Sequence, residues 1–130
     1  MKSLLAILSL AFLMFACEKP NQTPEGPTDV RVWNITDQDF TNLSVDTGGG
    51  DHDYGNLSAG EKTDYYRFEK AYPDAEITVI INGEEYSTGP QDYTYATYIG
   101  PDMVTYKVYI SNPELKILGV DIVLEGPIEE

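Results

Sequence analysis

The chain has 130 residues, with 22 Asp and Glu against 8 Lys and Arg, so its net charge at pH 7 is −14. Nucleic acid and anionic lipid headgroups are therefore unfavourable partners, because they share the sign of this surface. The single cysteine excludes an internal disulfide, and the single histidine excludes a zinc site made mainly of His and Cys.

Residues 1–16 have the pattern of a secretory signal peptide. Lys2 supplies the early positive charge, and the segment from residue 4 to residue 16 is apolar and carries no charge. This run is shorter than the about 20 apolar residues that span a bilayer. We therefore expect export followed by cleavage, and we leave residues 1–16 out of the expected fold.

Cys17 follows the apolar run directly. The segment from Leu13 to Cys17 resembles the lipobox of bacterial lipoproteins, in which a small residue such as Ala16 precedes the cysteine. The resemblance implies that Cys17 carries acyl chains such as palmitate and anchors the protein to a membrane of the cell envelope. The outer membrane is expected, with the domain periplasmic or surface-exposed. The alternative is an ordinary signal peptide that is cut nearby and leaves a free thiol.

Residues 17–28 form the expected tether. Pro20, Pro24, Gly26 and Pro27 lie among polar residues, a composition that favours a flexible, semi-extended linker over a packed segment.

Beyond the linker, apolar residues alternate with polar ones between turn signals, which predicts an all-β domain over residues 29–125 and an acidic tail over 126–130. Asn82-Gly83 predicts a tight hairpin. A change of apolar parity predicts a β-bulge at Leu118-Gly119. Residues 47–56 are expected to form a long loop. The expected strands cover residues 29–35, 41–46, 63–69, 76–81, 84–87, 103–110 and 115–124, and the third of them places Tyr66 and Phe68 on one face.

Part of this pattern resembles the immunoglobulin-like accessory domains of bacterial envelope proteins. The resemblance implies a single immunoglobulin-like β-sandwich of about seven strands, without the antibody-type disulfide. It implies no catalytic residue. The positions that carry it are Val30, Val32, Asn34, Leu57, Gly60, Glu61 and Tyr65.

One possible metal site lies in the expected long loop. Asp46, Asp51 and Asp53 surround a run of three glycines, and free backbone carbonyls could join their carboxylates around Ca²⁺. Calcium needs six to eight oxygen ligands, and the loop lacks the regular twelve-residue spacing. A solvated acidic loop is the alternative, and no other cofactor is expected.

A second possible site is the tyrosine-rich segment between residues 89 and 101. Tyr93, Tyr95 and Tyr98 could stack on a sugar or peptide, because aromatic faces with nearby polar groups suit such ligands. Half-buried strand positions would account for the same tyrosines.

The possible catalytic motif is Asp46-Thr47-Gly48, the tripeptide of aspartic proteases. The segment from Ile117 to Asp121 resembles the supporting hydrophobic-hydrophobic-Gly segment of retroviral-type proteases. The residues after Gly48 depart from that family, so we expect no enzyme. The sequence favours a non-enzymatic binding or accessory module for a glycan, peptide or protein partner, with the protease and a calcium-binding structural module as alternatives.

Overall fold

The computed structural model describes residues 26–129, so the signal peptide, Cys17 and most of the linker lie outside the described residues. The described part contains strands and no helix, and hence no helix that could cross a membrane. The last strand runs to Pro127, which brings two residues of the expected tail into the domain. The strands are β1 (Thr28–Asn34), β2 (Phe40–Gly49), β3 (Asp51–Leu57), β4 (Tyr66–Phe68), β5 (Lys70–Ile81), β6 (Glu84–Ser87), β7 (Asp102–Asn112) and β8 (Ile117–Pro127).

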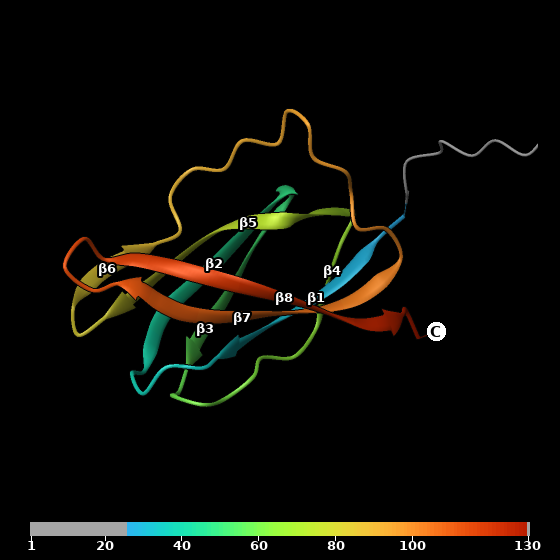
Figure 1. The fold of residues 1–130 in the computed structure, drawn as a ribbon. Helices are drawn as coiled ribbons and strands as arrows, with labels where there is room; N and C mark the ends of the chain where they lie inside the picture. Colours follow the sequence, from blue (N-terminus) through green and yellow to red (C-terminus); the bar gives the residue numbers. More distant parts are fainter. Residues whose placement is uncertain (1–25, 130) are drawn as a thin grey trace, which may run out of the picture.

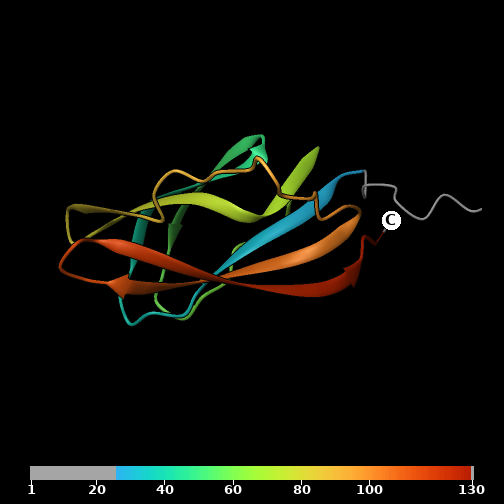
Figure 2. The same cartoon turned by 45° about the horizontal axis from the view of Figure 1, so that its top comes forward.

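The eight strands form one mixed sheet in the order β3-β2-β5-β6-β8-β7-β1-β4. β6 and β8 pair through one position, Ser87 with Ile117, and at this point the sheet folds from one layer into the other. Figures 1 and 2 show two layers, with β3, β2, β5 and β6 in one and β8, β7, β1 and β4 in the other. The expected all-β sandwich is confirmed, with eight strands in place of about seven.

The core lies between these two layers. β1 buries every second residue, as period-two side-chain alternation requires, and so do the stretches 43–47 of β2 and 75–81 of β5. β7 buries Val104, Tyr106 and Val108 in the same way, with Thr105 buried as well. Tyr106 is the largest fully buried side chain, and its hydroxyl donates to the Tyr72 carbonyl at 2.9 Å. The central core residues are Val30, Val32, Leu43, Val45, Ile77, Val79, Val104, Tyr106 and Val108.

The segment 47–56, expected as a loop, is a β-hairpin that adds β3 to the sheet. β2 continues to Gly49, and the Thr47 N–H donates to the Gly50 carbonyl at 2.9 Å. Gly48 and Gly50 have φ angles of +83° and +141°, which glycine adopts at no steric cost. The loop prediction is wrong because β3 has few aliphatic residues and its half-buried positions are His52 and Tyr54.

The expected strand over 63–69 is shorter than its pattern indicates. β4 contains three residues, while β5 begins at Lys70 rather than at residue 76. Tyr66 and Phe68 were expected to share one face, and they contact each other edge-on at 4.9 Å between ring centroids. Phe68 is buried, whereas Tyr66 is 39% exposed at the margin of the sandwich.

The β-bulge expected at Leu118-Gly119 of the last strand lies instead on the neighbouring strand, β7. The register shifts between Ile110 and Asn112 of β7, opposite Leu118 and Ile117, rather than at Leu118-Gly119. Leu118 is consequently buried at 3% exposure, while Ile117 is 37% exposed. Farther along β8, Leu124 is 61% exposed, and beyond Ile117 β8 pairs with β7 alone.

Candidate functional site

β3 and β4 are the two ends of the sheet, so one side of the sandwich is not closed by backbone hydrogen bonds. β3 pairs with β2 and β4 pairs with β1, each through one edge. The opposite edge of each strand leaves backbone N–H and C=O groups without a strand partner. We call the space between β3 and β4 the edge groove, and its lining residues are given below.

Four aromatic rings meet along the inner side of the edge groove. His52 stacks on Tyr66 with ring centroids 3.7 Å apart and an interplanar angle of 12°. Tyr54 contacts His52 edge-on at 4.7 Å, and Phe68 contacts Tyr66 in the same way. The Tyr54 hydroxyl donates to the Val30 carbonyl at 2.6 Å, and burial raises the pKa of Tyr54 so that it remains a donor. These contacts join β3 to the opposite layer.

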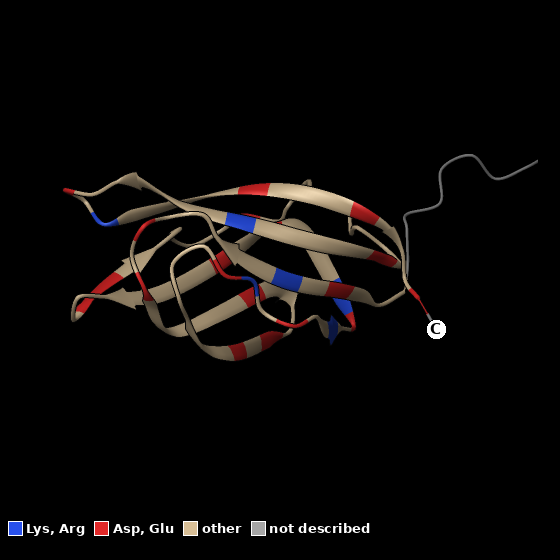
Figure 3. Cartoon of the chain, turned by 90° about the horizontal axis from the view of Figure 1, so that it is seen from below, with Lys and Arg blue, Asp and Glu red and all other residues tan. Residues whose placement is uncertain are grey.

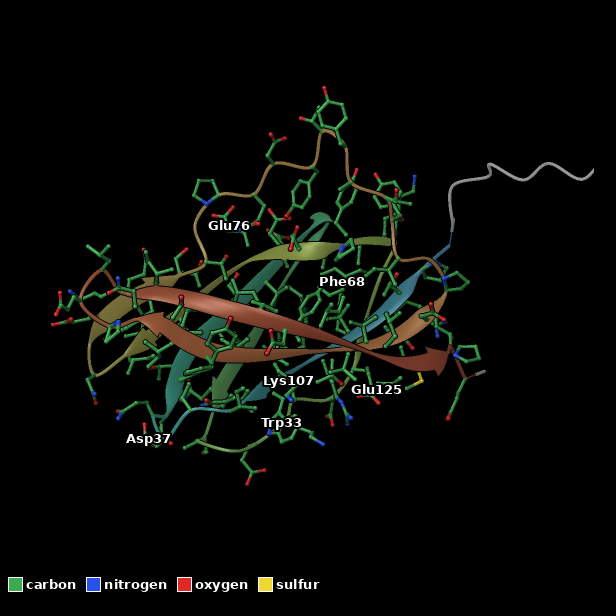
Figure 4. The ribbon with its side chains drawn as sticks, viewed as in Figure 1. Trp33, Asp37, Phe68, Glu76, Lys107 and Glu125 are labelled. Atoms are coloured by element: carbon green, nitrogen blue, oxygen red, sulfur yellow. The ribbon has the colours of Figure 1, made fainter. Side chains whose placement is uncertain are left out.

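Two hollows open along the edge groove, and Tyr66 lines both. Figure 4 shows Phe68 between the two layers. The first hollow has a volume of about 300 Å³ and is lined by His52, Tyr54, Asn56, Leu57, Lys62, Thr63, Asp64, Tyr65 and Tyr66. The second has a volume of about 340 Å³ and is lined by Gly49, Gly50, Asp51, Tyr66, Arg67, Phe68 and Glu69.

The lining of the first hollow combines ring faces with several kinds of hydrogen-bonding group. Asn56 supplies an amide, Asp64 a carboxylate and Lys62 an ammonium group, while the Thr63 hydroxyl already accepts from the Val32 N–H and donates to the Asp64 carbonyl. Rings such as that of Tyr66 pack against the C–H faces of a sugar while the polar groups bond to its hydroxyls. The volume reaches the lower end of the range of small-ligand sites. The arrangement is suited to holding a short oligosaccharide.

The three tyrosines expected to bind a ligand lie in the long connection between β6 and β7. Tyr93 and Tyr98 both stack on Tyr72 of β5, each at 4.4 Å between ring centroids. The ammonium of Lys70 lies 4.8 Å from the Tyr98 ring centroid. These rings therefore fasten the connection to β5, and each has one face against Tyr72. Tyr95 is 98% exposed, so the three do not form one binding surface.

The three aspartates of the possible calcium site lie on the β2–β3 hairpin. Asp46 and Asp51 are cross-strand partners, and Asp53 pairs with Ser44. All three side chains are exposed, and Asp46 Oδ1 accepts the Gly48 N–H at 2.9 Å, which shapes the turn. Within residues 26–129, no three His, Cys, Asp or Glu side chains are placed to hold a metal ion. The geometry gives the calcium prediction no support.

The protease motif lies on the same hairpin. The Thr47 hydroxyl donates to the Lys70 carbonyl at 2.8 Å and so holds β2 to β5, while Asp46 is exposed. Leu118 and Gly119 of the supporting segment lie on β8, which is not a neighbour of β2. Aspartic proteases need two carboxylates that share a proton, from two lobes or from the two chains of a dimer, and the chain contains Asp-Thr-Gly once, so a second chain would have to supply the other carboxylate. The described geometry therefore does not favour the protease alternative.

Sequence patterns do not single out the edge groove. His52 draws notice in the sequence as the one histidine, and Tyr66 as half of an inward-facing pair. The sequence shows aromatic rings at positions 52 and 54 in one segment and at positions 66 and 68 in another, but it does not connect the two segments. Only the strand order shows that these segments end the sheet and face each other.

No family model and no curated protein sequence matches the chain. A solved structure described as "NMR structure of the protein from Eubacterium rectale" is similar to it at 15% sequence identity. The match covers 82% of this chain and 95% of that one, with a TM-score of 0.44. A similarity of this degree bears on neither fold nor function.

Proposed function

We propose that the chain is a non-enzymatic glycan-binding module of the bacterial cell envelope, anchored to a membrane by lipid on Cys17. Its binding site is the edge groove. The observation that carries the proposal is the pair of hollows that meet at the exposed ring of Tyr66. The anchor is supported by the signal-peptide pattern and the lipobox resemblance. The proposal includes an outer-membrane location, with the domain periplasmic or surface-exposed.

The charges of the edge groove favour a neutral sugar. Asp51, Asp64 and Glu69 line the two hollows, and Lys62 and Arg67 are the basic residues among them. An acidic ligand would meet three carboxylates in a protein whose net charge is already −14. A neutral oligosaccharide hydrogen-bonds to both kinds of group without this repulsion.

Thermal unfolding with a panel of neutral envelope oligosaccharides tests the proposal. The chain from Glu18 to Glu130 is suitable, because every residue of the core cluster lies in β1–β8. A sugar at 100 times its dissociation constant should stabilise the fold by about 2.7 kcal/mol. Replacement of Tyr66 by Ala should abolish this shift.

Tyr95→Ala is the matched control, because it removes the same side chain from a fully exposed position outside the groove. It should leave the shift unchanged. Loss of binding in Tyr95→Ala with retention in Tyr66→Ala would place the site in the β6–β7 connection instead. The absence of a shift with every sugar in the panel would refute the glycan function.

The lipid anchor has its own test in cells. The full-length protein should be recovered in the membrane fraction and should incorporate labelled palmitate. Cys17→Ala should lose both properties, since buried acyl chains supply the membrane affinity. A Cys17→Ala protein that stays in the membrane fraction would show that Cys17 is not the anchor.

A further inference from the structure

Three of the lysines described here contact aromatic rings instead of carboxylates. Cation–π contacts occur about once per 70–80 residues, and residues 26–129 hold four. Lys62 and Lys107 both lie over the ring of Trp33, at 4.4 and 5.3 Å from its centroid. Within the described residues, neither lysine makes an ion pair with a carboxylate. Their charges are therefore open to an external anion.

Strand register places these residues side by side. Trp33 on β1 pairs with Lys107 on β7, and a β-bridge joins it to Lys62 on its other side. Trp33 and Lys107 lie together on one face in Figure 4, and Figure 3 shows basic positions on adjacent strands there. The Trp33 indole N–H donates to the Gly60 carbonyl at 3.1 Å, which fixes the ring in place. We call Lys62, Trp33 and Lys107 the tryptophan patch.

The charged residues next to the tryptophan patch form contacts with one another. Glu125 accepts a hydrogen bond from Thr105 at 2.8 Å and lies 3.5 Å from Arg31, whose guanidinium also covers the Tyr65 ring. Asp121 is the cross-strand partner of Lys107 but lies outside ion-pair distance. Lys62 also interacts electrostatically with Glu125 and helps to lower the pKa of that carboxyl, but among the described residues neither lysine of the patch forms an ion pair.

We propose that the tryptophan patch binds a linear acidic polysaccharide, with Lys62 and Lys107 pairing with its carboxylates while the exposed part of the half-buried Trp33 ring contacts its sugar carbons. This surface lies on the outer face of β1 and β7 and is a second site, which shares Lys62 with the first hollow of the edge groove but binds a charged ligand instead of a neutral one. A narrow polymer fits this protein better than a flat anionic surface. Charges beyond the Debye length of about 8 Å are largely screened, so a single strand meets the lysines and escapes most of the acidic surface.

Trp33 is the only tryptophan of the chain, so its fluorescence reports directly on the tryptophan patch. The chain from Glu18 onward would be titrated with polygalacturonate, neutral dextran and polyphosphate. Polygalacturonate should change the emission of Trp33 and neutral dextran should not. Raising the salt from about 0.02 M to about 0.5 M should weaken the binding by about tenfold or more, because the contact is ionic and exposed.

Variants separate a binding role from a structural one. K62Q/K107Q should bind polygalacturonate at least about tenfold more weakly, and K62R/K107R should retain binding because Arg also pairs with carboxylates. K116Q is the control for the loss of a lysine charge elsewhere, since Lys116 pairs with Glu84 away from Trp33, and it should bind as the unchanged chain does. Far-UV circular dichroism checks that each variant is folded.

Three results would overturn the proposal: no emission change with polygalacturonate at low salt, undiminished binding by folded K62Q/K107Q, or binding of polyphosphate as tight as that of polygalacturonate. The last result would show that the negative charge of the ligand is sufficient for binding and that the sugar contributes nothing.

Lys62 also lines the first hollow of the edge groove, so Tyr66→Ala is a further control. It should leave polygalacturonate binding intact while abolishing the binding of neutral oligosaccharides, and loss of both would merge the two sites and overturn the separate assignment.

Discussion

Gly48 offers the sharpest test of how the long β6–β7 connection is held. Its φ angle is +83°, and a Cβ added there would lie 2.5 Å from Cδ2 of Tyr72 and 3.0 Å from Cε2 of Tyr93. Tyr72 cannot easily move aside, because it is stacked against both Tyr93 and Tyr98. Gly48→Ala should therefore disturb the ring stack that fastens the connection to β5.

The cost has two parts that a control can separate. A non-glycine residue with this left-handed φ costs about 1–2 kcal/mol, and forcing an extra methyl group against packed rings adds about 1–3 kcal/mol. Gly48→Ala should lower the free energy of unfolding by about 2–5 kcal/mol. Gly55→Ala meets nothing within 4 Å at a φ of +85°, so it carries the conformational cost only.

Urea unfolding followed by far-UV circular dichroism would measure both variants against the unchanged chain. The difference between the two losses gives the cost of the contact with Tyr72 and Tyr93. Near-UV circular dichroism should also report a changed tyrosine signal in Gly48→Ala alone. Equal losses in the two variants would refute the reasoning, because they would leave the ring stack with no part in the effect.

Other substitutions test single contacts. Asn34→Ala removes a fully buried amide that donates to the Gln38 and Leu57 carbonyls, and calorimetry should show a loss of about 2–4 kcal/mol. Tyr106→Phe should cost about 0.5–1.5 kcal/mol in urea unfolding, the worth of one hydrogen bond, and a larger loss would mean a change in packing. Thr105→Val should raise the pKa of Glu125, because the Thr105 hydroxyl is the main cause that lowers it, and NMR titration of the carboxyl measures this. A carboxyl whose pKa is lower in the folded protein than in the unfolded chain stabilises the fold at pH values above the unfolded pKa. This contribution should disappear as the pH falls through the folded pKa of Glu125, and it should be smaller in the variant.

Local sequence patterns were sufficient for most of the strands. Val30 and Val32 alternate with polar residues and are both buried, since side-chain direction in a strand depends only on position parity. The Asn82-Gly83 hairpin is confirmed, with φ angles of +53° and +81° at its two central residues. Both features require information from neighbouring residues alone.

The export and lipid-anchor prediction also comes from the sequence by itself, because a signal peptide is recognised as a linear pattern of charge and apolar length. It stays a prediction, since Cys17 lies outside the described residues.

Only the tertiary structure decided which aromatic residues are available to a ligand. Tyr93 and Tyr98 belong to a tyrosine-rich segment that indicated a binding site, yet each has one ring face against Tyr72, a residue well before them in the chain. His52 and Tyr66 lie in unrelated segments and meet because β3 and β4 are the two ends of the sheet. Sequence determines the alternation within each strand, whereas the order of the strands depends on long-range packing, and it is this order that creates the edge groove.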